Sequence, residues 1–235
     1  MQITKEIEII DLGLWIKKRK LLVLADFHIG FEEALNKQGI LVPRFQFDDI
    51  IRRLEIMFEK VKPQTIVING DMKHEFGTIS EQEWRETLKL IDFLAEHCKN
   101  LLLTKGNHDT ILGPIAKKRN IEIVDYFGTE GILIIHGDNI PKDISKYKTI
   151  IIGHEHPAVS IYERGRQETF KCFLVGKYKG KTLIVQPSFN LVTEGTDVLR
   201  EEILSPFLKQ NLNSFNVYIV ADKVYDFGKL KNLKS

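Results

Sequence analysis

Runs of apolar residues that end at polar clusters organise the first part of the chain. The runs at 21–25, 65–69 and 101–103 are almost continuously apolar, as expected for strands that are covered on both faces of a sheet. Between these runs, residues 47–61 and 84–95 carry apolar side chains at helical spacing. Strands that alternate with helices in this order predict parallel βαβ units.

Local signals set the ends of these elements. Pro63 ends the first helix, and residues 80–83, Ser-Glu-Gln-Glu, form a capping box that begins the second. Two short apolar stretches within residues 7–16 predict an opening hairpin. Residues 30–43 predict a long loop or a short helix, and residues 110–113 predict the start of another helix.

After Asn120 the pattern changes to strands alone. Extended segments are predicted at 121–124, 131–135, 149–152, 159–162, 170–175, 182–185, 215–220 and 224–227, with a turn at 177–181. We therefore predict an α/β fold of two packed sheets with helices outside, in a single domain that spans residues 1–235. The strands within residues 158–227 are expected to complete the second sheet of this domain.

The composition narrows the class of protein. The 235 residues are 43% hydrophobic and can bury a full core, and 34 basic against 32 acidic residues neither mark nor exclude a nucleic-acid-binding protein. Cys98 and Cys172 lie far apart in sequence and fit a reducing compartment. No signal peptide begins the chain, and no apolar run approaches the roughly 20 residues of a membrane helix. We expect a cytoplasmic protein without membrane contact.

Five polar clusters follow the apolar runs, and they contain five of the seven histidines. They are Asp26-x-His28, Gly70-Asp71, Gly106-Asn107-His108-Asp109, His136-Gly137-Asp138 and Gly153-His154-Glu155-His156. Side chains alternate along a strand, so Asp26 and His28 are expected to point to the same side. Because ligands of open sheets bind beyond the carboxyl ends of the strands, parallel neighbours would bring all five clusters to one rim.

Each cluster alone fits an ordinary turn or helix cap, and their shared position favours a site. The side chains are carboxylates, imidazoles and an amide, without cysteine, which suits Mn²⁺, Fe or Zn²⁺ and argues against a thiolate zinc site. The candidate ligand groups are more numerous than a single tetrahedral ion binds. With one carboxylate bridging, they divide over two ions, and two ions about 3.5–4 Å apart are suited to attack on a phosphate ester.

In this order the clusters resemble the calcineurin-like metallophosphoesterases over residues 26–156. The resemblance implies a four-layer αββα sandwich, in which helices flank two mixed sheets and the site lies on the rim. It implies metal ligands as follows: Asp26, His28 and His156 for the first ion, Asn107, His136 and His154 for the second, and Asp71 for both.

The same resemblance implies that His108 protonates the leaving oxygen of the substrate and that Asp109 orients the His108 ring. The carboxylates of Asp138 and Glu155 are candidates for hydrogen bonds that hold the ligand histidines from behind. The expected activity is hydrolysis of a phosphodiester by in-line attack of a hydroxide that bridges the two ions. Mn²⁺ is the first choice of metal, with Fe, Zn²⁺ and Ni²⁺ as alternatives.

A narrower resemblance is carried by residues 26–32, 70–76 and 153–158. These segments are similar to small stand-alone relatives of SbcD-type repair nucleases and to DNA-ligase-associated phosphoesterases. The expected partner is a phosphate ester, with small or single-stranded nucleic acid among the substrates. Residues 30–43 follow the first ligands and should border the pocket, and they contain no arginine that would hold a polymer. The sequence does not assign an oligomeric state.

Two alternatives stay open. A DNA-repair-type nuclease would apply the same chemistry to a polymer, and a basic track toward the rim would favour it. The candidates for this track are Lys17, Lys18, Arg19, Lys20, Arg44, Lys73, Lys177, Lys179 and Lys181. A non-catalytic binding scaffold on the same fold, such as the retromer subunit that resembles these enzymes, need not retain every ligand.

Overall fold

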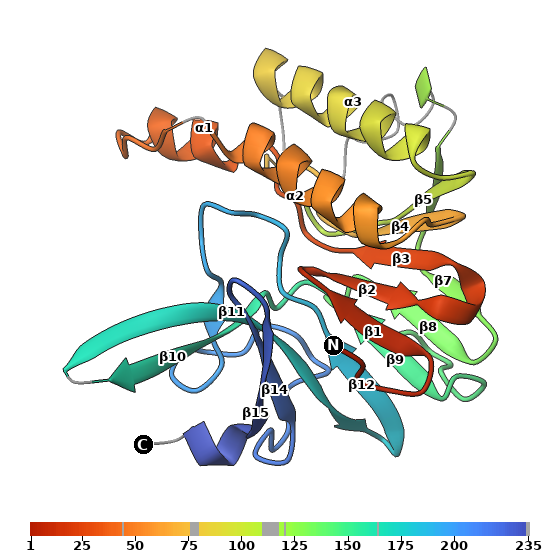
Figure 1. Ribbon diagram of the computed structural model, residues 1–235, viewed down its shortest axis with the longest axis vertical. Helices are drawn as coiled ribbons and strands as arrows, with labels where there is room; N and C mark the ends of the chain where they lie inside the picture. Colours follow the sequence, from red (N-terminus) through yellow and green to blue (C-terminus); the bar gives the residue numbers. More distant parts are fainter. Residues whose placement is uncertain (44, 76–79, 110–117, 120, 164, 234–235) are drawn as a thin grey trace.

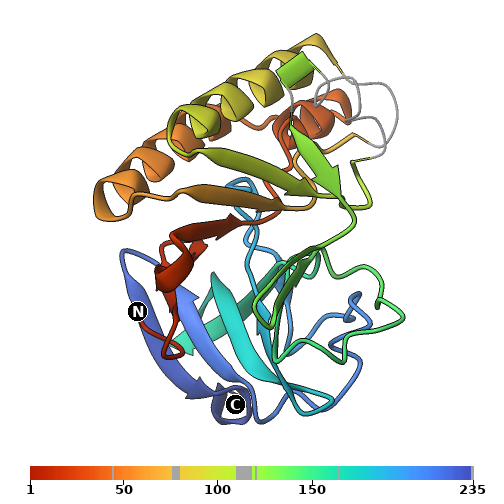
Figure 2. The same cartoon turned by 90° about the vertical axis from the view of Figure 1, so that its right-hand side faces the viewer.

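The structure, a computed structural model, describes residues 1–43, 45–75, 80–109, 118–119, 121–163 and 165–233. Two mixed β-sheets face each other, and helices cover the outer side of one of them, as Figure 1 and Figure 2 show. The predicted α/β architecture is therefore confirmed. The helix predicted from residues 110–113 and the basic residue Arg44 lie outside the described residues.

The first sheet combines the predicted hairpin with the predicted parallel strands. Its order is β1 (Ile7–Ile10), β2 (Gly13–Ile16), β3 (Leu21–Leu24), β4 (Thr65–Asn69), β5 (Asn100–Thr104) and β6 (Glu122–Val124). Strands β1 to β3 pair antiparallel, whereas β3 to β6 pair parallel. The carboxyl ends of β3, β4 and β5 consequently lie at one edge of this sheet.

The described α-helices lie over the first sheet (Figure 2). They are α1 (Phe31–Lys37), α2 (Gln46–Lys60) and α3 (Glu81–Glu96). Helix α3 begins where the capping box predicts, because Ser80 Oγ accepts a hydrogen bond from the Glu83 N–H at 3.1 Å. Helix α2 ends before Pro63, as predicted. Among the described residues, no helix is long and apolar enough to span a membrane.

The second sheet holds the strands of the C-terminal part. Its order is β13 (Thr196–Asp197), β10 (Pro157–Glu163), β11 (Arg166–Tyr178), β12 (Lys181–Val185), β9 (Thr149–Ile152), β8 (Ile132–Ile135) and β7 (Phe127–Thr129), and β14 (Asn216–Val220) pairs with β11 and β15 (Val224–Lys229). Strands β8, β9 and β12 are parallel. The predicted turn at 177–181 is shorter than expected, because β11 continues to Tyr178 and only Lys179 and Gly180 connect it to β12.

The core fills both faces of the second sheet. Its inner side packs on the first sheet, where Phe173 and Ile184 join the same buried cluster as Leu22 and Ile66. Its outer side is covered by residues 198–215 instead of the helical layer that the resemblance implies, and the described part of this segment contains no α-helix.

This outer segment is irregular for a physical reason. Pro206 cannot continue a helical hydrogen-bond pattern. The N–H groups of Leu204 and Ser205 instead donate to the buried Glu155 carboxylate, at 3.0 and 2.7 Å. Phe207 and Leu208 are then buried against the sheet.

Candidate metal centre

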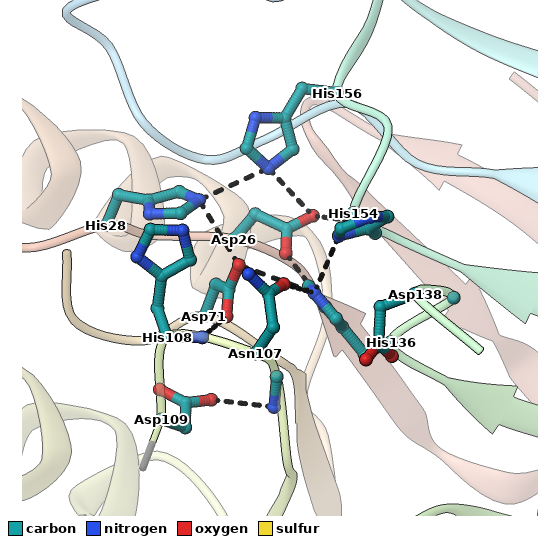
Figure 3. Close-up of polar contacts among 12 residues, drawn as sticks. Asp26, His28, Asp71, Asn107, His108, Asp109, His136, Asp138, His154 and His156 are labelled. Atoms are coloured by element: carbon teal, nitrogen blue, oxygen red, sulfur yellow. Dashed lines mark hydrogen bonds and ion pairs between the residues drawn. The ribbon is translucent and has the colours of Figure 1, made fainter. Parts of the chain in front are cut away.

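The five polar clusters converge on one rim of the sandwich, at the ends of β3, β4, β5, β8 and β9. Figure 3 shows the side chains of Asp26, His28, Asp71, Asn107, His136, His154 and His156 around a common centre, whereas Asp109 and Asp138 lie away from it. Three groups of described side chains offer ligand atoms within 4.8 Å of one another. Two of them combine carboxylates with imidazoles, and these are Asp26, His28 and His156 on one side and Asp71, His136 and His154 on the other. The division matches the two ligand sets that the resemblance implies.

The donor atoms of the first group are spaced as ligands around one ion would be. The His156 Nε2 atom lies 3.5 Å from Asp26 Oδ2 and 3.3 Å from His28 Nε2. The His28 Nε2 atom lies 3.6 Å from Asp71 Oδ2. Metal–ligand bonds of about 2.1 Å at tetrahedral or octahedral angles place neighbouring ligand atoms about 3.0–3.4 Å apart. The spacing of this group therefore fits a shared cation.

The second group has the same spacing around His136. The His136 Nε2 atom lies 2.8 Å from Asn107 Oδ1, 3.0 Å from His154 Nδ1 and 3.4 Å from Asp71 Oδ2. Asn107 thus lies beside this group, where the resemblance implies a ligand. The Oδ2 atom of Asp71 faces both groups, so a single carboxylate oxygen lies where a bridging ligand is required.

The backbone of Asp26 and His28 has a conformation that the sequence analysis did not predict. Asp26 and His28 point to the same centre, as predicted, but the predicted reason is wrong. Strand β3 ends at Leu24, and both residues have left-handed φ, 55° and 47°. Asp71, His154 and His156 share this conformation. Such residues cost on the order of 1 kcal/mol or more each and persist only where their surroundings fix them.

Hydrogen bonds from the neighbouring loops hold this strained backbone. The N–H of Asp26 donates to the carbonyl of Gly70 at 3.3 Å, and the N–H of His28 donates to the carbonyl of Asp71 at 3.0 Å. The N–H of Asn190 donates to the carbonyl of Asp26 at 3.1 Å. Two neighbouring loops, the one after β4 and the one that contains Asn190, therefore determine where the Asp26 and His28 side chains point.

Two glycines allow the carboxylates to approach the backbone closely. A Cβ atom on Gly153 would lie 2.3 Å from Asp26 Oδ2, and one on Gly106 would lie 2.1 Å from Asp71 Oδ1. In this space Asp26 Oδ2 accepts the His154 N–H at 3.0 Å. The Oδ1 atom of Asp71 accepts the His108 N–H at 2.9 Å. The glycines of these motifs thus make room for the candidate ligands.

The charges of the site favour a cation. Burial acts to raise the pKa of Asp26, but the facing His156 and His136 outweigh it and hold that pKa below its usual range. Burial lowers the pKa of His28 to about 3, which keeps its imidazole in the neutral form that binds metals. The Oδ1 atom of Asp26 is buried without a hydrogen bond. Burial acts to lower the pKa of His136, but Asp26 and Asp71 outweigh it and raise that pKa well above its usual value. A divalent ion would take the place of the His136 proton, and ionised carboxylates with deprotonated imidazoles are a donor set that fits such an ion.

The Asp109 carboxylate binds the backbone of two loops. Its Oδ2 accepts the Gly106 N–H and its Oδ1 accepts the Met72 N–H, both at 3.0 Å. Burial raises the pKa of this carboxyl to about 7. Asp109 therefore ties the loop after β5 to the loop after β4. The Nδ1–H of the His108 ring donates to the carbonyl of His74.

The sequence did not identify Lys73 and His74, in the loop after β4, as part of the site. The His74 ring lies beside the His108 ring, 5.4 Å between centroids, and its nitrogen is within 4.8 Å of those of His28 and His108. Lys73 is fully buried, and its Nζ donates to the carbonyl of His108 at 2.7 Å. The Glu83 carboxylate accepts the N–H groups of His74 and Glu75, at 2.9 and 3.0 Å. The position of His74 three residues after Asp71 was the signal in the sequence.

The described basic candidates do not form an exposed track to this rim. The run Lys17–Lys20 precedes β3, so it lies at the start of that strand, whereas the site follows its end. Lys177 and Lys181 flank the turn between β11 and β12. Because Thr182 of β12 pairs with Thr149 at the start of β9, this turn lies at the edge where β9 begins, whereas the site follows the end of β9. Lys73 is buried. Glu155 likewise does not support a ligand histidine, because it binds the backbone of residues 204 and 205.

Comparisons with known proteins identify the family of the chain and a protein with the same fold. The sequence pattern of the calcineurin-like phosphoesterases matches residues 19–186. The nuclease MPE of Pseudomonas putida has the same fold, with a TM-score of 0.66 at 19% identity over 92% of each chain. The Escherichia coli phosphoesterase YfcE is 13% identical over 89% of this chain and 97% of its own, with a TM-score of 0.40. No protein with curated annotation matches the sequence significantly. This chain belongs to the calcineurin-like phosphoesterase family.

Proposed function

We propose that this protein hydrolyses phosphodiester bonds with two divalent metal ions. One observation carries the proposal: Asp71 Oδ2 lies 3.6 Å from His28 Nε2 and 3.4 Å from His136 Nε2, and so faces both groups of candidate ligands. A mononuclear site would not need a carboxylate in that position. Bound there, two ions would polarise the phosphorus, neutralise charge on its oxygens and lower the pKa of a water molecule.

His108 is the proposed proton donor to the leaving oxygen. Its Nδ1–H is committed to the carbonyl of His74, so a second proton on Nε2 is the one that the ring can give up. The ring stands edge-on to His28, 4.9 Å between centroids, at the border of the first group. Lys73 fixes the carbonyl of His108 and thereby the backbone that carries the ring. This geometry supports positioning of the imidazole beside a phosphate at the centre.

The donor set supports Mn²⁺ as the first choice among metals. Carboxylate and amide oxygens with imidazole nitrogens suit Mn²⁺, Fe, Zn²⁺ or Ni²⁺, and the proposed site contains no thiolate. The substrate is proposed to be a small or single-stranded phosphodiester, because the described basic residues of the expected track lie at the opposite edge of the sheets or are buried. The name of the Pseudomonas putida protein keeps a nuclease as the alternative.

A panel of metals and substrates tests this function. The metal-free protein, reconstituted with each ion in turn, is offered a model diester, a monoester, a cyclic nucleotide, and single- and double-stranded DNA. With Mn²⁺ we expect hydrolysis of the model diester, at a rate that changes little between low and physiological salt. Efficient cleavage of duplex DNA with steep salt dependence and little diester activity would favour the repair nuclease. Absence of turnover with every metal would favour the scaffold.

A further inference from the structure

A hollow that the proposed reaction does not use opens beside the candidate metal centre. It has a volume of about 510 Å³ and lies among the loops that follow β5, β6 and β8. Its walls include Lys105, Asn107, Tyr126, Asp138, Asn139 and Pro141. Pockets of about 300–1,000 Å³ are the usual size for small-molecule ligands. The hollow is therefore large enough for a substituent of the substrate.

The position of the hollow connects it to the phosphate. Asn107 lines it and also contributes Oδ1 to the second group of candidate ligands, 2.8 Å from His136 Nε2. In Figure 3, Asp138 and His108 lie on opposite sides of Asn107. A group that enters the hollow is thus next to the second group of ligands and away from the proposed proton donor. This is the place for a substituent that stays on the phosphorus while the leaving oxygen departs near His108.

The walls of the hollow suit a flat ring with hydrogen-bonding edges. Tyr126 is 44% exposed, which leaves an aromatic face uncovered at the end of β6. Lys105 and Asn139 can donate hydrogen bonds, whereas the carboxylates of Asp125 and Asp138 can accept them. The Asn139 side chain is oriented by its own bond to Asp138 Oδ1, at 3.0 Å.

Other occupants fit this chemistry less well. A second phosphate would meet two carboxylates, Asp125 and Asp138, against the single ammonium of Lys105. A quaternary ammonium group would be drawn to the acids and to Tyr126, but Lys105 would repel it and the described walls hold one aromatic ring instead of a cage. A purine or pyrimidine uses the aromatic face, the donors and the acceptors together.

We propose, resting on the function above, that this hollow is a nucleobase subsite in which Tyr126 stacks on the base of a nucleotide ester. The substrate class is then a nucleotide or a single-stranded oligonucleotide rather than a simple alkyl diester. Stacking of one base on an aromatic side chain contributes about 1–3 kcal/mol. This corresponds to a change in affinity of roughly 5- to 140-fold.

Two esters with the same leaving group isolate the subsite. Thymidine 5′-(p-nitrophenyl phosphate) carries a nucleoside, and methyl p-nitrophenyl phosphate does not, so the bond that breaks is the same. We expect Tyr126→Ala to raise KM for the nucleotide ester roughly 5- to 140-fold with little change in kcat, and to leave the methyl ester unaffected. Tyr126→Phe should behave as the wild type. Tyr162→Ala, which removes a ring that is 51% exposed on β10, is the matched control.

A binding measurement separates this proposal from the proposed function. Calorimetric titration of the metal-free protein with thymidine 5′-monophosphate should show binding that Tyr126→Ala abolishes and Tyr126→Phe retains. If neither ester is hydrolysed but this pattern holds, the reaction is wrong and the subsite stands. Equal effects of Tyr126→Ala on both esters, no effect on either, or a selective effect on the p-nitrophenyl ester of phosphocholine would overturn the nucleobase assignment.

Discussion

Replacing Gly153 with alanine should weaken the binding of one metal ion at the centre and leave the fold intact. The added Cβ atom would lie 2.3 Å from Asp26 Oδ2 and 3.1 Å from Asp26 Cγ. Non-bonded carbon and oxygen atoms rarely approach closer than about 3.0 Å, so the carboxylate or the turn must move by about 0.7 Å. Metal sites tolerate deviations of only about 0.2 Å in their bonds. Asp26 would therefore no longer fit its ion.

The expected loss can be given a size. Disturbing the groups that orient metal ligands typically lowers affinity by about 10- to 100-fold, or about 1.4–2.8 kcal/mol. The affected ion is the one that Asp26, His28 and His156 share. The ion held by Asn107, His136 and His154 should be affected less, because the atoms that the new methyl group meets belong to Asp26, which is not among its proposed ligands.

Calorimetric titration of the metal-free protein with Mn²⁺ measures both affinities, and thermal unfolding reports the fold. Gly13→Ala is the control, since its Cβ atom would also be crowded, 2.7 Å from Met57 Cε, but meets the flexible end of a core side chain. That variant should lose about 1–3 kcal/mol of stability and still bind both ions normally. A folded Gly153→Ala protein that binds two ions with wild-type affinity would refute the reasoning.

Four further outcomes follow from the structure. His108→Ala should retain both metal ions and lose more turnover on esters with poor leaving groups than on p-nitrophenyl esters; a lost ion would show that His108 is a ligand. Asp109→Asn should lower the free energy of unfolding by about 1–3 kcal/mol, because one backbone N–H loses its acceptor, and should slow all esters by the same factor; selective loss on poor leaving groups would restore its predicted role. Burial lowers the pKa of Lys171 to about 8. Between pH 8 and about 10.4 the unfolded chain therefore binds more protons than the folded protein, and the free energy of unfolding should rise by up to about 3 kcal/mol over this range. Lys171→Met should flatten this rise, and equal slopes of unfolding free energy against pH in the two proteins would contradict it. Residues 158–227 should unfold with the rest in one calorimetric transition, and a separate transition of this segment would contradict the single domain.

The candidate ligands could be predicted because each belongs to a local pattern. An apolar run that ends at a polar cluster marks the carboxyl end of a strand, and parallel pairing of β3, β4 and β5 brings such ends together. The pattern needs no knowledge of side-chain geometry. The order of the clusters, over residues 26–156, resembles the calcineurin-like phosphoesterases, and the family match over residues 19–186 includes this region.

The orientations of the site residues could not be predicted, because partners distant in sequence determine them. The left-handed conformations of Asp26 and His28 depend on carbonyl groups of residues 70 and 71. Asp109 binds Met72, from a loop 37 residues earlier, and this contact has no local signal. The irregular layer over the second sheet depends on the buried Glu155 carboxylate, which captures backbone N–H groups that a helix would otherwise use.

The central claim is that two ions share Asp71, and the metal content of the reconstituted protein tests it most directly. Elemental analysis at saturating Mn²⁺, combined with anomalous diffraction at the manganese edge, should give two ions per chain about 3.5–4 Å apart, on either side of Asp71 Oδ2. Asp71→Ala should weaken the binding of both ions together. One ion per chain at saturation, or two ions of which Asp71 contacts only one, would contradict the account.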